Sequence, residues 1–146
     1  MTNQTKRAFC LRGAANTGKS HTLRNLFNEI VEKYHLNKDQ DCDIKEDGKI
    51  DILVIIHNVN GLKIGICSYG DNQVDIQSRV SILVKENCDI IFCACRTYGE
   101  SLDETLKLCE IGYILKFISK QTSNNESEHD NINLNQAKAL LAAAGL

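Results

Sequence analysis

Eight residues near the N-terminus carry the most specific chemical pattern in the chain. Residues 13–20 read Gly-Ala-Ala-Asn-Thr-Gly-Lys-Ser. Gly13 and Gly18 have no Cβ and can adopt backbone geometry that turns consecutive N–H groups toward one anion. Lys19, expected at an exposed junction of loop and helix, can reach the outer phosphates of a polyphosphate, and the Ser20 hydroxyl can coordinate Mg²⁺. The residues expected to contact a Mg²⁺-bound nucleoside triphosphate are Gly13, Ala14, Ala15, Asn16, Thr17, Gly18, Lys19, Ser20 and His21.

The flanking residues predict the strand and the helix that such a loop needs. Residues 7–12 read as a short buried strand, and residues 19–34 have helical periodicity. The start of that helix adds unsatisfied N–H donors and the positive end of the helix dipole. His21 lies in the first helical turn, where we expect its backbone to matter more than its ring.

With these flanks, residues 7–26 resemble the P-loop NTPase superfamily. The resemblance implies nucleotide binding by the loop backbone, Lys19 and Ser20, together with a second acidic site at the end of a later strand. It does not imply which reaction follows. Beyond residue 26 the resemblance is one of layout rather than of sequence.

Length and composition predict one compact domain. The chain has 146 residues, 42% of them apolar and 25% charged, and a net charge of −2. This charge argues against a broad nucleic-acid-binding surface. No apolar run approaches the length of a membrane span, and the first residues lack the apolar centre of a signal peptide. We therefore expect a cytoplasmic protein.

Two later strands are expected to form a hairpin. Residues 49–57 and 62–68 are apolar and strand-like, and only Asn-Val-Asn-Gly separates them. Strands joined so tightly must be antiparallel. We therefore expect an α/β fold, a three-layer P-loop NTPase fold with a mostly parallel five-stranded sheet and one antiparallel hairpin strand. The acid-rich residues 36–48 before the hairpin read as a loop or a frayed edge strand.

The hairpin resembles the layout of the small GTPases, whose third strand ends at the metal and γ-phosphate site. Here that strand ends in Ser-Tyr-Gly-Asp over residues 68–71, and not in Asp-x-x-Gly. The guanine-reading Asn-Lys-x-Asp is also absent, because residues 95–99 read Cys-Arg-Thr-Tyr-Gly. The missing motif favours ATP over GTP.

Asp71 is the acidic residue predicted for the second site. It follows an apolar strand at the end where ligands gather in an α/β sheet. A carboxylate there can hold Mg²⁺, through water, or orient an attacking nucleophile. Alternatively, Asp71 caps the helix that is expected to begin at Asn72.

Arg96 follows the apolar residues 89–95, which read as a strand buried on both faces. A cation at this end of the sheet could stabilise charge on a transferring phosphoryl group, so Lys19, Asp71 and Arg96 form the predicted catalytic set. Alternatively, Arg96 and Glu100 form a solvated ion pair.

The seven cysteines do not have the spacing of a disulfide framework or a zinc site. Cys93 and Cys95 are two residues apart in one expected strand, so both side chains point to the same face. Packing in a reduced, buried core is favoured over metal or redox chemistry at this pair.

The chain divides into a nucleotide-binding domain over residues 1–120 and a C-terminal part over residues 121–146. The latter is expected to be a polar linker, residues 121–133, followed by a short alanine-rich helix, residues 134–146. Helices are also expected over residues 72–87 and 100–109, and a last strand over residues 112–118.

The function expected from these features is Mg²⁺-dependent binding and hydrolysis of a nucleoside triphosphate by a small P-loop NTPase. Hydrolysis in a switch or motor subunit would drive partner exchange. The partner would be another protein or the other subunits of an oligomer. A small phosphotransferase is the second reading, although residues 96–101 leave little room for an arginine-bearing lid. A nucleotide-sensing module without turnover is the third.

Overall fold

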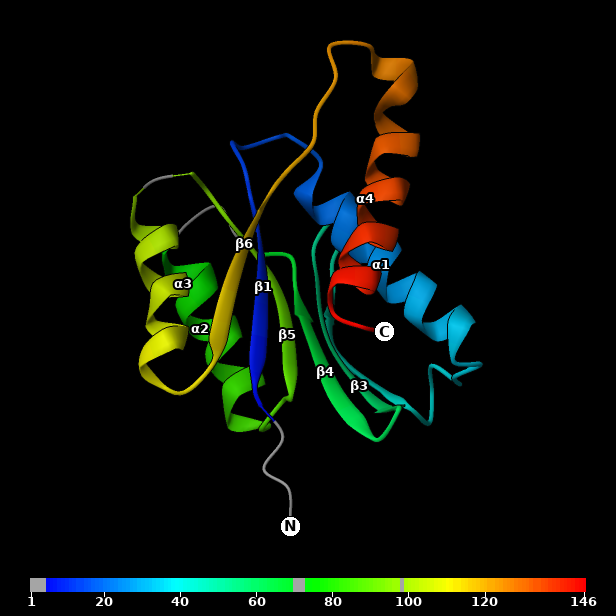
Figure 1. Ribbon diagram of the computed structural model, residues 1–146, viewed down its shortest axis with the longest axis vertical. Helices are drawn as coiled ribbons and strands as arrows, with labels where there is room; N and C mark the ends of the chain where they lie inside the picture. The colour runs from blue at the N-terminus through cyan, green and yellow to red at the C-terminus, as the bar shows by residue number, and fades with distance from the viewer. Residues whose placement is uncertain (1–4, 70–72, 98) are drawn as a thin grey trace.

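The computed structural model describes residues 5–69, 73–97 and 99–146 (Figure 1). The protein has an α/β fold in which a six-stranded mixed sheet carries helices on both faces. Within the described residues, no helix is long and apolar enough to cross a membrane. The elements are β1 (Arg7–Arg12), α1 (Lys19–Lys33), β2 (Cys42–Asp47), β3 (Ile52–Val59), β4 (Leu62–Cys67), α2 (Gln73–Lys85), β5 (Ile90–Cys95), α3 (Glu100–Glu110), β6 (Ile114–Ser119), the 3₁₀ turn η1 (Glu126–Glu128) and α4 (His129–Ala143).

The strand order of the sheet is β2-β3-β4-β5-β1-β6. The strands β4, β5, β1 and β6 are parallel to their neighbours in this series, whereas β3 is antiparallel to both β2 and β4. Six strands are present where five were expected, because the acid-rich segment contains the edge strand β2. Its side chains are mostly exposed, which explains the weak strand signal in the sequence.

The predicted hairpin between β3 and β4 is confirmed. Asn60 and Gly61 form its turn, with φ angles of 54° and 76°. Two consecutive positive φ angles suit the right-handed twist of paired strands, and Asn-Gly tolerates them best. The strand β3 continues to Val59, beyond the predicted end at residue 57.

The helices form two layers, α1 with α4 on one face of the sheet and α2 with α3 on the other (Figure 1). The central strand β5 is buried at all six positions, as its continuous apolar sequence predicted. Two apolar clusters follow from this arrangement, one on each face.

The C-terminal helix begins earlier than expected. The predicted linker over residues 121–133 ends at residue 128, and α4 spans His129–Ala143. Asn125 accepts a hydrogen bond from the backbone N–H of Ser127, which starts the turn that leads into α4. The first turns of α4 are polar, so the apolar pattern marks only its second half. That half lies in the same core as α1, through Ala137, Leu140 and Leu141.

Leu140→Ala should destabilise the whole protein, because the side chain is 1% exposed in the core shared by α1 and α4. We expect a loss of roughly 2–5 kcal/mol in the free energy of unfolding, measured in urea. Leu106→Ala on α3, where the side chain is 43% exposed, is the control and should cost under about 1 kcal/mol. A loss for Leu140→Ala as small as the loss expected for the control would show that α4 is not part of the cooperative core.

Candidate functional site

Residues 13–20, called the glycine loop below, join β1 to α1 as the sequence predicted. Gly18 is the residue before α1 and has φ 89° and ψ 17°, and Asn16 also has a positive φ, 60°. The Thr17 hydroxyl donates to the Ala14 carbonyl at 2.7 Å and closes the loop on itself. No side-chain hydrogen bond caps the start of α1, and its first turn contains no acidic residue. The first N–H groups of α1 therefore have no acceptor within the helix and can bind an anion.

The two glycines are needed for different reasons. The left-handed φ of Gly18 agrees with the prediction that this position needs a backbone conformation that is unfavourable for residues with a Cβ. A Cβ there would also lie 2.7 Å from Asn133 Oδ1. The prediction that Gly13 needs backbone geometry forbidden to other residues was wrong, since its φ is not in the left-handed region. Gly13 is required by packing, because a Cβ would lie 2.9 Å from the Cβ of Lys120.

Lys19 is 5% exposed, so the expectation of an exposed side chain was also wrong. Its Nζ donates to the carbonyl oxygens of Gly13 at 2.6 Å and of Ala14 at 3.0 Å. These two hydrogen bonds hold the ammonium against the backbone of the glycine loop. A short change of side-chain torsion angles would bring it to an anion bound by the loop.

An acidic residue that the sequence reasoning missed, Asp51, lies beside the loop. The Ser20 hydroxyl donates to Asp51 Oδ1 at 2.5 Å, and the Ser68 hydroxyl donates to the same oxygen at 2.9 Å. Ser68 Oγ also accepts from the Ile52 N–H at 2.8 Å. These contacts join the start of α1, the start of β3 and the end of β4.

Strand direction explains why Asp51 reaches this place. Because β3 runs opposite to β4, the residue before β3 lies at the same edge of the sheet as the ends of the parallel strands. The sequence reading placed Asp51 inside a strand over residues 49–57. A charged residue directly before the apolar run of a reversed strand was the signal that could have identified it.

The oxygen atoms of Ser20 and Asp51 suit a hard cation such as Mg²⁺. Both side chains can contribute one oxygen ligand each, directly or through water. No group of three or more His, Cys, Asp or Glu side chains that could hold a metal ion occurs in residues 5–69, 73–97 and 99–146. Mg²⁺ commonly takes most of its ligands from phosphate and water, so two protein oxygens can suffice for it.

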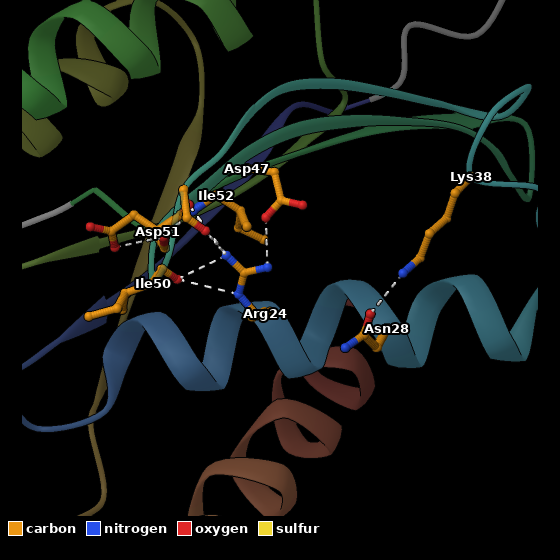
Figure 2. A network of polar contacts seen from close by, with 9 residues as sticks. Arg24, Asn28, Lys38, Asp47, Ile50, Asp51 and Ile52 are labelled. Carbon is orange, nitrogen blue, oxygen red and sulfur yellow. Dashed lines mark hydrogen bonds and ion pairs between the residues drawn. The ribbon is translucent and has the colours of Figure 1, made fainter.

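Arg24, one helical turn after Ser20, fixes the turn that ends in Asp51 (Figure 2). Its Nη2 donates to the carbonyls of Gly48 at 3.0 Å and Ile50 at 3.2 Å, and its Nε donates to Ile50 at 3.3 Å. Its Nη1 forms an ion pair with Asp47 at 2.9 Å. Arg24 thus positions Asp51 indirectly, by holding the main-chain carbonyls of the residues directly before it.

Two cavities adjoin the glycine loop. One, of about 320 Å³, lies between the loop and the pair Asp51 and Ser68. The other, of about 550 Å³, lies between the loop and the segment from Lys120 to Asn133. His21 lines both cavities with its exposed side chain.

The structure does not place the two other predicted catalytic residues, Asp71 and Arg96, at the glycine loop. Asp71 lies outside the described residues. Arg96 is exposed at the end of β5, where its backbone N–H donates to the Ser101 hydroxyl at 3.1 Å. It is not among the residues that line either cavity at the glycine loop. The described residues therefore bring Ser20 and Lys19 together with Asp51, and they do not bring Arg96 to the same place.

The cysteines of the central strands lie on the face covered by α2 and α3. The Cys10 thiol donates to Cys95 Sγ at 2.9 Å, and all cysteines are in the thiol form. That hydrogen bond lowers the pKa of Cys95, whereas burial raises the pKa of Cys10 and of Cys67. The carbonyl of Cys95 accepts from the Gly13 N–H at 3.1 Å. This hydrogen bond connects the strand that contains the buried cysteines to the start of the glycine loop.

Comparison with known proteins gave no relative: no family model matches the chain, and no match was found among the curated proteins or the solved structures.

Arg24→Ala should release the turn before β3. We expect a loss of about 1–3 kcal/mol in the free energy of unfolding, because several hydrogen bonds from a charged donor are removed. Asp47→Asn removes only an exposed ion pair and should cost less than about 1 kcal/mol. If Asp47→Asn cost as much as Arg24→Ala, the ion pair and not the carbonyl contacts would hold the turn.

Proposed function

We propose that the protein binds a nucleoside triphosphate together with Mg²⁺ and hydrolyses it, as a small P-loop NTPase. The observation that carries this proposal is the Ser20 to Asp51 hydrogen bond at the N-terminus of α1, next to a buried lysine. A hydroxyl, a carboxylate and an ammonium thereby lie around one helix N-terminus. That combination suits a polyphosphate with its metal ion better than it suits an uncharged ligand.

Binding of the phosphates would use the loop backbone and Lys19. The positive φ angles of Asn16 and Gly18 turn the backbone as an anion-binding concavity requires. The buried Lys19 ammonium is shielded from water, so its attraction for a phosphate is less screened than that of a surface lysine. The cavity of about 320 Å³ between the loop and Asp51 lies where the outer phosphates would be bound.

Hydrolysis transfers the outer phosphoryl group to water and releases the diphosphate, and it requires that the negative charge on that group be stabilised. Bound Mg²⁺ would neutralise charge on the phosphate oxygens. Asp51 would hold the ion with Ser20, and the second hydrogen bond from Ser68 would keep its carboxylate in one orientation. Lys19 would move from the Gly13 carbonyl to the phosphate oxygens.

ATP is the favoured substrate, since residues 95–99 lack the guanine-reading motif. The first experiment is to incubate the purified protein and Mg²⁺ with ATP and with GTP separately. Phosphate release and binding of each nucleotide are then measured. Absence of binding to both nucleotides would refute the proposal.

Lys19→Ala should weaken triphosphate binding by more than about tenfold, because an ammonium that contacts the outer phosphates is lost. Calorimetry measures the affinity, and thermal unfolding reports stability separately, since Lys19 is buried and its loss can affect both. Lys116→Ala, which removes an exposed lysine from β6, is the matched control and should change neither quantity. Unchanged affinity in the folded Lys19→Ala variant would refute the assignment of the glycine loop to phosphate.

Asp51→Asn should lower turnover by about tenfold or more and should lower nucleotide affinity less, because the carboxylate is assigned to the metal ion. The Mg²⁺ concentration for half-maximal rate should rise. Asp43→Asn on β2 is the matched control, because it removes a carboxylate away from the candidate site, and it should leave turnover unchanged. Asp71→Asn is measured in parallel, since Asp71 was predicted for this role from the sequence. Normal turnover of Asp51→Asn with a loss in Asp71→Asn would assign the acidic site to Asp71.

A further inference from the structure

The larger cavity at the glycine loop, about 550 Å³, has no role in the chemistry described so far. It shares Asn16, Thr17, Gly18 and His21 with the smaller cavity next to Asp51. The two cavities therefore adjoin the same part of the loop. The size of the larger one is in the range of ordinary small-molecule sites. A ligand that is charged at one end and carries a ring system at the other would fit this pair of cavities.

The far wall of this larger cavity is the segment between β6 and α4, which passes close to the glycine loop (Figure 1). Lys120 follows β6, and its N–H donates to the Arg12 carbonyl at 2.8 Å, directly before the loop. Gln136 of α4 is 3% exposed and donates to the Ser119 carbonyl at 2.7 Å. Its side-chain oxygen accepts from the Gln121 N–H at 3.0 Å. The wall is therefore attached to the sheet at its start.

The other end of the wall is attached to α1. Asn133 is 7% exposed, accepts from the Thr22 hydroxyl at 3.3 Å and lies directly against Gly18. His129 Nε2 lies 2.8 Å from the Ser123 carbonyl, and the Ser123 hydroxyl donates to Glu128 at 2.7 Å. Contacts at both ends and in the middle hold the segment, so the cavity is formed before any ligand binds.

The two cavities differ in the polar groups that line them. The smaller one is lined by Lys19 and the start of α1, which favour phosphate, and by Asp51, which is assigned to the metal ion. The larger one is lined by Glu126 and Asp130, whose carboxylates can accept hydrogen bonds from N–H and O–H groups, and by Lys120, whose Nζ donates to the Gln121 carbonyl. Ile132 adds an aliphatic surface against which a flat ring can pack. A nucleoside presents such donors on its sugar and base, so these acceptors suit the nucleoside while the start of α1 suits the phosphates.

We propose that the larger cavity holds the nucleoside of the bound nucleotide, with the carboxylate of Asp130 as a hydrogen-bond acceptor. This inference rests on the function proposed above, because it places the second half of the same ligand. The C-terminal segment then forms one wall of the binding site and is not a peripheral linker. The phosphates bind in the smaller cavity, which shares residues 16–18 with the larger one.

Inorganic tripolyphosphate separates this proposal from the function on which it rests. Calorimetry with Mg²⁺ compares tripolyphosphate, ATP and GTP on the full chain. We expect the better of the two nucleotides to bind at least about tenfold more tightly than tripolyphosphate. Binding of tripolyphosphate as tight as that of both nucleotides would overturn the nucleoside site and leave the phosphate site intact. No binding of any of the three would overturn both.

Thr122→Trp tests the location, because this exposed residue lines the larger cavity and an indole there would occupy part of it. We expect nucleotide affinity to fall by about tenfold and tripolyphosphate affinity to change by less than about twofold. Asn124→Trp, two residues further along and outside the lining, is the matched control and should change neither affinity. Equal effects of Thr122→Trp on nucleotide and tripolyphosphate, or no effect on either, would overturn the proposal.

Asp130→Asn tests the acceptor without a change of size. The variant should bind nucleotide several-fold more weakly and tripolyphosphate as the unaltered protein does. Unchanged nucleotide affinity would overturn the role of Asp130. Tighter tripolyphosphate binding with unchanged nucleotide affinity would show that the carboxylate acts on the phosphates instead, and it would also overturn that role.

Discussion

The candidate site depends on one carboxylate oxygen, Asp51 Oδ1, which accepts hydrogen bonds from Ser20 and Ser68. Through this atom the first turn of α1 is joined to the edge of the sheet at β3 and β4. A partly buried carboxylate is stable only when its oxygens have donors, and two hydroxyls supply them here. The position of Ser20 relative to the sheet, and therefore the direction of the helix N-terminus, follows from this contact.

The rest of the loop is positioned by close packing. Gly13 lies against Lys120 and Gly18 lies against Asn133, so both glycines have contacts from the C-terminal segment. Such close approach is available only to residues without a Cβ. The same segment is tied to β6 by Gln136 and shares its core with α1 through Leu140. Residues from the two ends of the chain thus form the candidate site together.

Much of the fold follows from local sequence patterns. The strand β1 has the predicted bounds, the hairpin turn occurs at Asn60 and Gly61, and β5 is buried on both faces as its apolar run indicated. These elements were predictable because period, turn residues and apolar runs are local signals. The strand β2 and the first turns of α4 were harder to predict. Their polar side chains are exposed or bind distant groups, so neither segment shows the apolar period of its element.

The glycine loop and its flanking strand and helix follow from local sequence, because the required residues are consecutive and the reasons for them are local. The acidic side chain that contacts Ser20 is instead set by the folding of the sheet. The strand reversal at β3 brings Asp51 to the edge of the sheet where the loop lies, and spacing along the chain does not specify that edge. The burial of Lys19 and the packing of Asn133 on Gly18 were decided in the same way. The contact of Asn133 with Gly18 joins residues more than a hundred positions apart. The burial of Lys19 depends on the folded shape of the loop, which the residue pattern alone does not specify.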